Sequence, residues 1–224
     1  MTCRGEIDAV SAYLVDIKRV DAAVAGVVLP AVTREVAARG DATDCFGLLA
    51  EMVRLLDGAL GGLLHTLRWQ VTPTYALEME ARGMGHVLMR QKFDFAAAHR
   101  LHNPALSDEE NRRLYGKCNN PRGHGHNYQF EPCVAIDSAS AARNTFTLAV
   151  METIAKAAIL DRFDHRHLNE DTEEFRQPGG LNPSVENIAM VFFGLLSARV
   201  REAGAELKAV TVWETDRTCC TYPG

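Results

Sequence analysis

Histidines at three positions of the chain have the spacing of a metal site. His124 and His126 flank Gly125 in a predicted strand, and side chains at positions i and i+2 of a strand point to the same face. His99 lies on the apolar face of a second predicted strand, which is expected to pair with the first. Three neutral imidazoles would leave a zinc ion its full charge and one open position, as in catalytic zinc sites. The alternative is that His99 is a core histidine and that the His-Gly-His run is a turn.

Two further groups could move protons near these histidines. Cys118 precedes His124 by six residues, and a thiol beside a metal cation or an imidazolium ionises more easily and becomes a better base or nucleophile. Asp164 and His165 are adjacent, so the carboxylate can orient the imidazole and support proton transfer. The alternatives are an ordinary free cysteine and a charged loop.

A carboxylate near the C-terminus could bind a ligand. Glu214 shares a predicted strand face with Val210 and Val212, and a carboxylate at the end of an apolar face needs a partner. The paired donors of a guanidine-like ring edge would fit it bidentately. The alternative is a glutamate in solvent at the end of a strand.

The surrounding residues predict the elements that must position these side chains. Alternating apolar residues predict strands over Phe93–His99 and Gly123–Val134, the second interrupted at Pro132. The long polar connection between them contains Ser107 and Glu110, which fit a capping box for a short helix.

The C-terminal part of the sequence predicts two helices followed by two strands. The first helix covers residues 145–160, and the second begins with Asn182 as N-cap and Pro183 in the first turn and runs to Gly204. The strands cover Lys208–Thr215 and Cys219–Tyr222.

A similar order of elements is predicted in the N-terminal part. Helices are expected over residues 9–38, with a kink or break at Pro30, and over 44–60, followed by strands over 63–70 and 75–80. Trp69 and Trp213 have matching places in the two series. This weak repeat predicts that residues 1–85 are the back half of a unit whose complete copy is residues 86–224.

Composition excludes several classes of protein. With 224 residues and a net charge of −5, the chain has no excess of Lys or Arg to neutralise phosphates, which argues against nucleic-acid binding. No uncharged apolar run reaches the roughly 18 residues of a membrane helix. The first twenty residues are too charged for a secretory signal, and six cysteines form no CxxC pair. We therefore expect a cytoplasmic protein with reduced thiols.

Five motif-like segments follow one another in the second part of the chain: Phe95–Leu101, Cys118–Tyr128, Leu160–His165, Asn182–Asn187 and Val212–Asp216. The Cys-Asn-Asn-Pro-x-Gly-His-Gly-His-Asn-Tyr run is the most specific of them. In this order the segments resemble those of the 6-pyruvoyltetrahydropterin synthase and 6-carboxytetrahydropterin synthase family, and the resemblance covers about residues 90–224.

The resemblance implies a fold and a set of roles. The fold would be an α+β tunnelling fold, an antiparallel sheet with two helices on one face, assembled into a barrel by several copies of the chain and here preceded by a degenerate partial copy at residues 1–85. The implied roles are Zn²⁺ ligands for His99, His124 and His126, a proton-abstracting base for Cys118, a proton relay for Asp164 and His165, a pterin anchor for Glu214, and lining of the ring pocket for Ser184 and Glu186.

The resemblance also implies a reaction. The substrate would be 7,8-dihydroneopterin triphosphate, which loses triphosphate and gives a 6-pyruvoyl- or 6-carboxytetrahydropterin, the latter in a queuosine pathway. Two alternatives remain, a non-catalytic pterin- or purine-binding subunit and a zinc hydrolase with Cys118 as nucleophile.

Val185 replaces a residue that is commonly polar in the family, and Ser184 stands where Thr is usual but keeps the hydroxyl. Gln70 stands where the repeat would place the equivalent of Glu214, so residues 1–85 are expected to be inactive.

Overall fold

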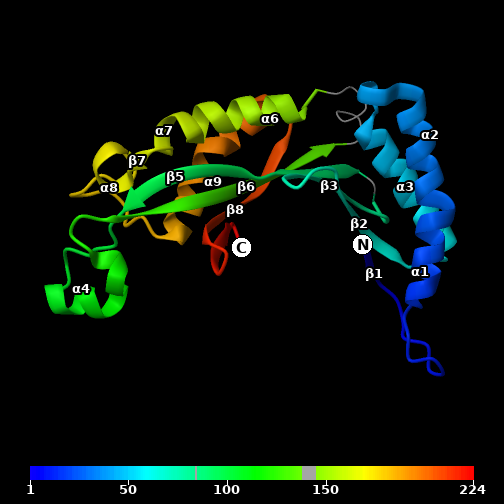
Figure 1. Cartoon of the computed structure of the whole chain (residues 1–224), viewed down its shortest axis with the longest axis horizontal. Helices are drawn as coiled ribbons and strands as arrows, with labels where there is room; N and C mark the ends of the chain where they lie inside the picture. Colours follow the sequence, from blue (N-terminus) through cyan, green and yellow to red (C-terminus); the bar gives the residue numbers. More distant parts are fainter. Residues whose placement is uncertain (84, 138–144) are drawn as a thin grey trace. The chain divides into compact units, whose positions relative to one another are not determined.

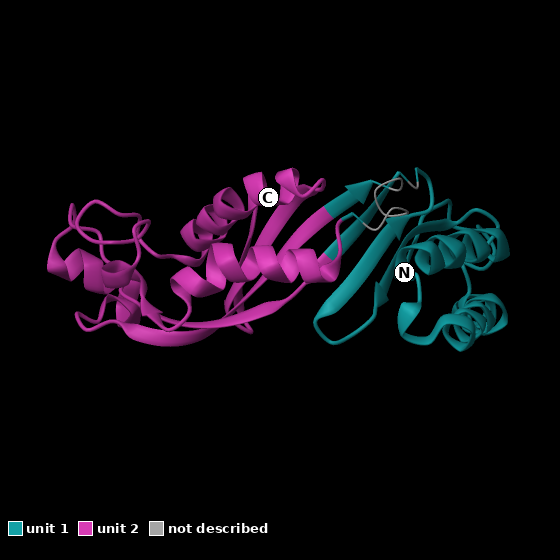
Figure 2. Cartoon of the chain, turned by 90° about the horizontal axis from the view of Figure 1, so that it is seen from above, with its two compact units in different colours: residues 1–89, 135–145 teal, residues 90–134, 146–224 magenta. Residues whose placement is uncertain are grey.

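The computed structural model of the chain describes residues 1–83, 85–137 and 145–224, and these divide into two compact units (Figure 2). Unit 1 comprises Met1–Met89 with Ala135–Thr145, and unit 2 comprises Arg90–Val134 with Phe146–Gly224. Two strands, β4 and β6, have residues in both units. The division therefore does not fall at one point of the sequence, whereas the repeat predicts a single boundary after residue 85.

Unit 1 has two helical segments followed by a hairpin, in the predicted order (Figure 1). Its strands follow the order β1-β2-β3-β4, and α3 buries the predicted stripe around Leu49, Met52 and Leu56. The elements are β1 (Thr2–Cys3), α1 (Ile17–Ala23), a π-helical turn (Val24–Val28), α2 (Leu29–Arg39), a 3-10 turn (Gly40–Ala42), α3 (Cys45–Ala59), β2 (Leu64–Gln70), β3 (Tyr75–Glu80) and β4 (His86–Gln91).

The first helix begins later than the sequence pattern predicts. The Asp8 carboxylate accepts hydrogen bonds from the backbone N–H groups of Val10 and Ser11, which fixes a turn instead of a helix. Asp16 then caps α1 by accepting from the N–H of Lys18. Pro30 stands in the first turn of α2, directly after the π-helical turn, where its missing N–H is tolerated.

Unit 2 is built on an antiparallel sheet with α6 and α9 side by side over it (Figures 1 and 2). β6 pairs with β5 on one side and with β8 on the other, and β9 extends the sheet beyond β8. The elements are β5 (Phe93–His99), α4 (Asp108–Tyr115), a 3-10 turn (Gly116–Asn119), β6 (His124–Asp137), α6 (Leu148–Ala155), a π-helical turn (Lys156–Leu160), α7 (Asp161–Phe163), β7 (Arg166–His167), α8 (Leu168–Asp171), α9 (Val185–Glu202), β8 (Glu206–Thr215) and β9 (Thr218–Tyr222).

An aromatic core joins the sheet of unit 2 to α9. Phe95 of β5 stacks on Tyr128 of β6, with ring centroids 4.9 Å apart, and Phe192 of α9 lies 5.4 Å from both Phe95 and Phe130. These side chains occupy the same face of β5 and β6 as the predicted metal ligands. The core therefore fixes the position of the two strands next to the histidines.

Two local predictions in unit 2 are wrong. Pro132 does not interrupt β6, which runs from His124 to Asp137 and also pairs with β4 and β8; the pairing with β5 ends at Phe130, so the missing N–H removes nothing from that ladder. The last helix is capped by Ser184, whose hydroxyl accepts from the N–H of Asn187, so Pro183 precedes the cap instead of lying in the first turn. The capping box of Ser107 and Glu110 is confirmed at α4.

A search of the described ranges finds no helix with the length and apolar character needed to span a bilayer.

Candidate functional site

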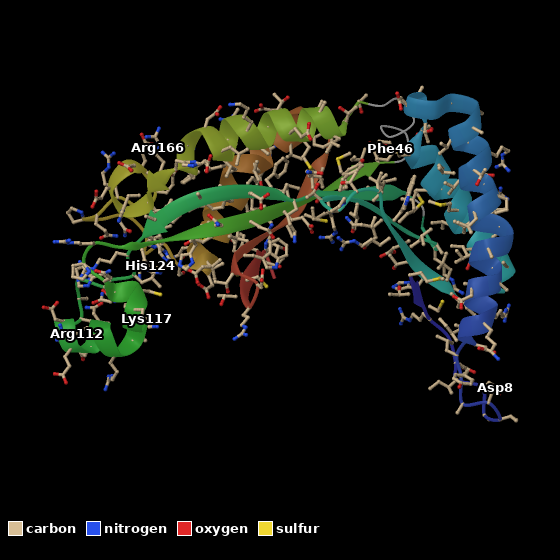
Figure 3. All side chains as sticks on the ribbon, in the orientation of Figure 1. Asp8, Phe46, Arg112, Lys117, His124 and Arg166 are labelled. Carbon is tan, nitrogen blue, oxygen red and sulfur yellow. The ribbon has the colours of Figure 1, made fainter. Side chains whose placement is uncertain are left out.

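Antiparallel pairing of β5 with β6 brings the three predicted metal ligands together. His99 stands opposite His124 in the register, and Ala97 stands opposite His126. The ring centroids are 4.6 Å apart for His99 and His124, 4.7 Å for His124 and His126, and 5.2 Å for His99 and His126. Figure 3 places the labelled His124 where β6 begins. One imidazole from β5 and two from β6 therefore form a single cluster.

The ring nitrogens have separations that a metal ion requires. Nε2 of His99 lies 3.2 Å from Nε2 of His124, and two nitrogen ligands about 2.0–2.1 Å from a tetrahedral zinc ion are roughly 3.4 Å apart. Nδ1 of His124 and Nε2 of His126 are buried and have no hydrogen-bond partner within the described part of the chain. A buried nitrogen without a partner is costly, and a bound cation would satisfy Nε2 of His126. Nδ1 of His124 is on the other side of the ring from the Nε2 that faces His99, so the same ion would leave it without a partner. The donor set therefore fits a zinc ion.

Cys118 and Glu214 lie close enough to the His99 imidazole to bind one metal ion together with it. Ligand atoms of His99, His124 and Cys118 are all within 4.8 Å of one another, and so are those of His99, His126 and Glu214. The Glu214 carboxylate is 3.4 Å from Nε2 of His99 and 3.6 Å from Nε2 of His126. His99 is thus common to two overlapping groups, whereas the sequence predicts one group of three histidines.

The environment of His99 keeps its imidazole neutral. The side chain is fully buried, and burial lowers the pKa of His99 from 6.5 to about 4. Nδ1 lies 2.8 Å from the carbonyl oxygen of Pro183, so the ring donates its proton there and leaves Nε2 directed at the cluster. A carbonyl partner of this kind fixes the tautomer that a metal ligand needs.

Cys118 is held at the end of a short 3-10 turn. The N–H of Leu101 donates to the Cys118 carbonyl, and the buried Asn119 side chain donates to the Leu101 carbonyl. Burial, and next the Glu214 carboxylate, raise the pKa of the Cys118 thiol. The protein groups alone therefore keep this thiol protonated, and a nearby divalent cation would favour the thiolate.

Asp164 and His165 form the predicted pair. Asp164 accepts a hydrogen bond of 2.8 Å from the N–H of Ala96 and contacts Nδ1 of His165 at 2.9 Å. Burial acts to raise the pKa of Asp164, but the hydrogen bonds from Ala96 and His165 outweigh it and lower the pKa. The His165 side chain is 81% exposed.

The pair lies outside the histidine cluster. His165 borders a hollow that is also lined by Ala96, Ala98 and Asn127, whose side chains point to the face of β5 and β6 opposite to that of His99. Neither Asp164 nor His165 belongs to the ligand groups around His99 in the described ranges. The chain therefore brings Cys118 to the histidines but does not bring Asp164 and His165 into that cluster.

Ser184 and Glu186 begin α9, next to the carbonyl that holds His99. The Ser184 hydroxyl caps the helix through the N–H of Asn187, at 3.4 Å. Glu186 is exposed in the first turn, and its charge contributes to raising the pKa of Cys220 on β9. Ser184 and Glu186 therefore both lie at the start of α9, directly after the Pro183 carbonyl that contacts His99.

Residues 88–224 match the model of the family described as 6-pyruvoyl tetrahydropterin synthase. The chain belongs to this family. The α+β tunnelling fold predicted for this region is confirmed by a solved structure of Caenorhabditis elegans 6-pyruvoyl tetrahydropterin synthase. That structure has a TM-score of 0.55 and 36% identity, over 62% of this chain and 96% of that one.

Curated relatives agree with the family assignment. Human 6-pyruvoyl tetrahydrobiopterin synthase is 37% identical over 134 residues, which are 60% of this chain and 89% of the human protein. The Drosophila melanogaster protein of the same name is 34% identical over 131 residues, 58% of this chain and 75% of that protein. The family match begins at residue 88, so most of unit 1 lies outside it.

Three residues around the family's motif were not assigned roles by sequence reasoning. The Pro183 carbonyl fixes His99, and Tyr128 lies beneath the cluster with its hydroxyl 3.3 Å from Nδ1 of His99. Gly123 has a φ of +68°, and a Cβ there would lie 2.6 Å from Nε2 of His167. Tyr128 could have been found from the sequence, since it follows His126 by two residues on the same strand face.

Proposed function

We propose that the chain is a zinc-dependent pterin synthase, a carbon–oxygen lyase that acts on 7,8-dihydroneopterin triphosphate. The observation that carries the proposal is the convergence of Cys118 and Glu214 on the His99 imidazole, within one cluster of three histidines. The names of the curated relatives support a pterin product. The product would be a 6-pyruvoyl- or 6-carboxytetrahydropterin, and those names favour the pyruvoyl form.

Each side chain would have one task in this reaction. Glu214 binds the guanidine-like edge of the pterin ring through paired hydrogen bonds. Cys118 removes a carbon-bound proton, and Asp164 with His165 return a proton to the ring. Zinc held by His99, His124 and His126 would supply Lewis acidity toward the hydroxyl groups of the substrate side chain. Triphosphate leaves by elimination, and no external oxidant is needed because the ring is reduced as the side chain is oxidised. The 6-carboxy product would in addition consume water and release the two terminal side-chain carbons as acetaldehyde.

We also propose that the active enzyme is a homo-oligomer. Cys118 and Glu214 gather at the His99 imidazole, whereas Asp164 is bound to the backbone N–H of Ala96 and, in the described residues, belongs to neither ligand group around His99. His165 is largely exposed and free to meet a neighbouring molecule. Asp164 and His165 of one copy would therefore serve the Cys118 of another.

Residues 1–85 would be a degenerate partial copy of the same fold. Both series have a helix containing a π-helical turn, a later helix and a hairpin, β2–β3 in one case and β8–β9 in the other, although β7 and α8 stand between the helices of the second series. Gln70, at the place of Glu214, donates its amide hydrogens to the carbonyls of Thr72 and Tyr75 within its own hairpin. A side chain held in this way offers no carboxylate to a pterin, which supports an inactive copy.

The test is incubation of the purified zinc-loaded protein with 7,8-dihydroneopterin triphosphate, followed by mass spectrometry. Release of tripolyphosphate with a 6-pyruvoyl- or 6-carboxytetrahydropterin would support the proposal and identify the product. Phosphate release with the side chain intact would indicate a hydrolase. Tight binding without turnover would indicate a pterin-binding subunit, and either result would contradict the proposed synthase.

A further inference from the structure

His102 is a half-buried histidine that has no role in the proposed reaction. It lies in the short segment that follows His99 at the end of β5. Its Nδ1 is 3.1 Å from Nδ2 of Asn119 and 3.2 Å from Nη2 of Arg100. Because amide and guanidinium nitrogens only donate, Nδ1 of His102 is the acceptor for both, and its ring proton is on Nε2. Two donors from different segments therefore converge on one acceptor.

The buried side chain of Asn119 uses both hydrogens of its amide. Nδ2 donates to the Leu101 carbonyl at 2.8 Å as well as to Nδ1 of His102. Since a carbonyl oxygen can only accept, the contact with Leu101 identifies which amide atom is the nitrogen. Removal of the acceptor at His102 would leave one hydrogen of a buried amide without a partner, which is costly.

Asn119 directly follows Cys118 in the 3-10 turn, where Figure 3 labels the preceding Lys117. Main-chain groups of the turn are bound to the same segment after His99. The N–H of Leu101 donates to the Cys118 carbonyl at 2.8 Å, and Nε of Arg100 donates to the Asn119 carbonyl at 3.4 Å. The position of the Cys118 thiol relative to β5 thus depends on hydrogen bonds between two short segments.

The segment Arg100–His102 is itself held from two sides. The N–H of Arg100 donates to Oδ1 of Asn169 in α8 at 2.7 Å, and the Arg100 carbonyl accepts from Nδ2 of Asn169 at 3.0 Å. The N–H of His102 donates to Oδ1 of Asn182, before α9, at 3.1 Å. The turn that contains Cys118 is therefore attached to a part of the chain that is fixed by other elements.

We propose that His102 is a positioning residue that, through the Asn119 amide, holds the Cys118 thiol within reach of the His99 imidazole. Ligand atoms of Cys118, His99 and His124 lie within 4.8 Å of one another, so a displaced turn would separate the thiol from the cluster. The inference rests on the proposed role of Cys118 as base, and it adds a residue on which the place of that base depends.

The test compares the zinc-loaded full-length protein with its His102→Leu and His102→Asn variants. Leucine removes the acceptor, whereas the amide oxygen of asparagine lies as many bonds from the backbone as Nδ1 of histidine. In His102→Leu, kcat should fall by about 10–100-fold with unchanged KM and zinc content, because a misplacement of about 1 Å can cost about 100-fold. His102→Asn should keep most of the turnover, although leucine would fill the space of the ring better.

Alkylation by iodoacetamide gives a readout that needs no turnover. The chelator-treated full-length chain is alkylated, and mass spectrometry follows each cysteine. Cys118 should react severalfold faster in His102→Leu than in the wild type or His102→Asn, because its half-buried thiol becomes more accessible. Cys45 of unit 1 is also half-buried and should react at one rate in all three proteins, so it is the internal reference.

The proposal is overturned if His102→Leu keeps the wild-type kcat and the wild-type alkylation rate at Cys118, or if His102→Asn loses as much as His102→Leu. Faster alkylation of Cys45 would reveal an unfolded His102→Leu. His102→Gln, whose amide oxygen lies one bond farther from the backbone, then takes its place with the same expected results. A wild-type protein without turnover would contradict the proposed function, while the alkylation rates would still decide the role of His102.

Discussion

Among the single residues of the candidate site, His99 is the one that contacts most of the others. Its Nε2 lies near His124 and Glu214, and its Nδ1 is bound to a carbonyl 84 residues away in the sequence. Sequence spacing predicts the pair of histidines on β6, because strand alternation is a local rule. It does not predict the Pro183 carbonyl, since only the folded chain brings α9 next to β5.

Replacing Cys118 with Ala tests the proposed base. Turnover should fall by about 10²–10⁴-fold, the usual contribution of an acid–base group, while zinc content stays at the wild-type level because the histidines remain. Turnover and metal are measured on the same preparation. Cys45→Ala is the control, since Cys45 is also half-buried with its pKa raised by burial. Normal turnover in Cys118→Ala would remove this thiol from the reaction.

Replacing His124 with Ala tests the ligand set. Loss of one of three protein ligands should weaken zinc binding by more than the roughly 10–100-fold caused by removing a group that only hydrogen-bonds to a ligand, and activity should be lost with the metal. Metal content after dialysis measures the effect. His86→Ala is the control, because His86 is exposed on β4. Unchanged metal content would show that the ligands are assigned wrongly.

The elements that carry the site were predicted well where the signal is local. The bounds of β3 and β5 and the capping box of α4 agree with the sequence pattern. The errors have local causes too. Asp8 and Asp16 bind backbone N–H groups and delay α1, and Ser184 takes the cap that Asn182 was expected to provide. Hydrogen-bonding side chains therefore set the ends of elements that hydrophobic periodicity alone leaves open.

Gly123 joins the turn that contains Cys118 to β6, and its replacement tests how closely these two elements pack against their neighbours. A Cβ there would lie 2.6 Å from Nε2 of His167 and 2.9 Å from the His99 carbonyl oxygen, and φ is +68°. Gly116 also has a positive φ, +53°, but a Cβ would meet nothing within 4 Å. Gly116→Ala should therefore cost about 1 kcal/mol of stability, and Gly123→Ala about 1–3 kcal/mol more, with weaker zinc binding. Equal losses in chemical denaturation would contradict the crowding at Gly123.

At the scale of the whole molecule, the stability of the metal-free protein should depend on pH through His99. The pKa of His99 is about 4 in the folded protein, whereas a histidine free of such burial has a pKa of 6.5, so the unfolded chain binds the proton more strongly. The free energy of unfolding should fall as pH drops from 6.5 toward 4, by about 3 kcal/mol, and this loss should level off below that pH. Urea denaturation of chelator-treated protein measures it. His99→Gln should lack this part of the slope, and parallel curves would contradict the prediction.

The proposed assembly makes a separate prediction for mixed oligomers. Cys118→Ala and His165→Ala chains should each be inactive, but co-expression in equal amounts should restore about a quarter of wild-type activity, because a quarter of randomly formed sites combine two intact halves. Activity per zinc ion is the measurement. If the mixture is as inactive as its components, the two groups act within one chain.

The strands shared between the units limit how the polypeptide can be divided. Val87 and Met89 of β4 and Ala135 and Ile136 of β6 are buried and belong to unit 1, although three of the four lie within the region that matches the family and Val87 directly precedes it. A shortened gene product that starts at residue 86 would keep these four apolar side chains and lose the rest of their unit. Such a fragment should be prone to self-association, so we expect the N-terminal region to be needed for solubility even if it never touches a pterin.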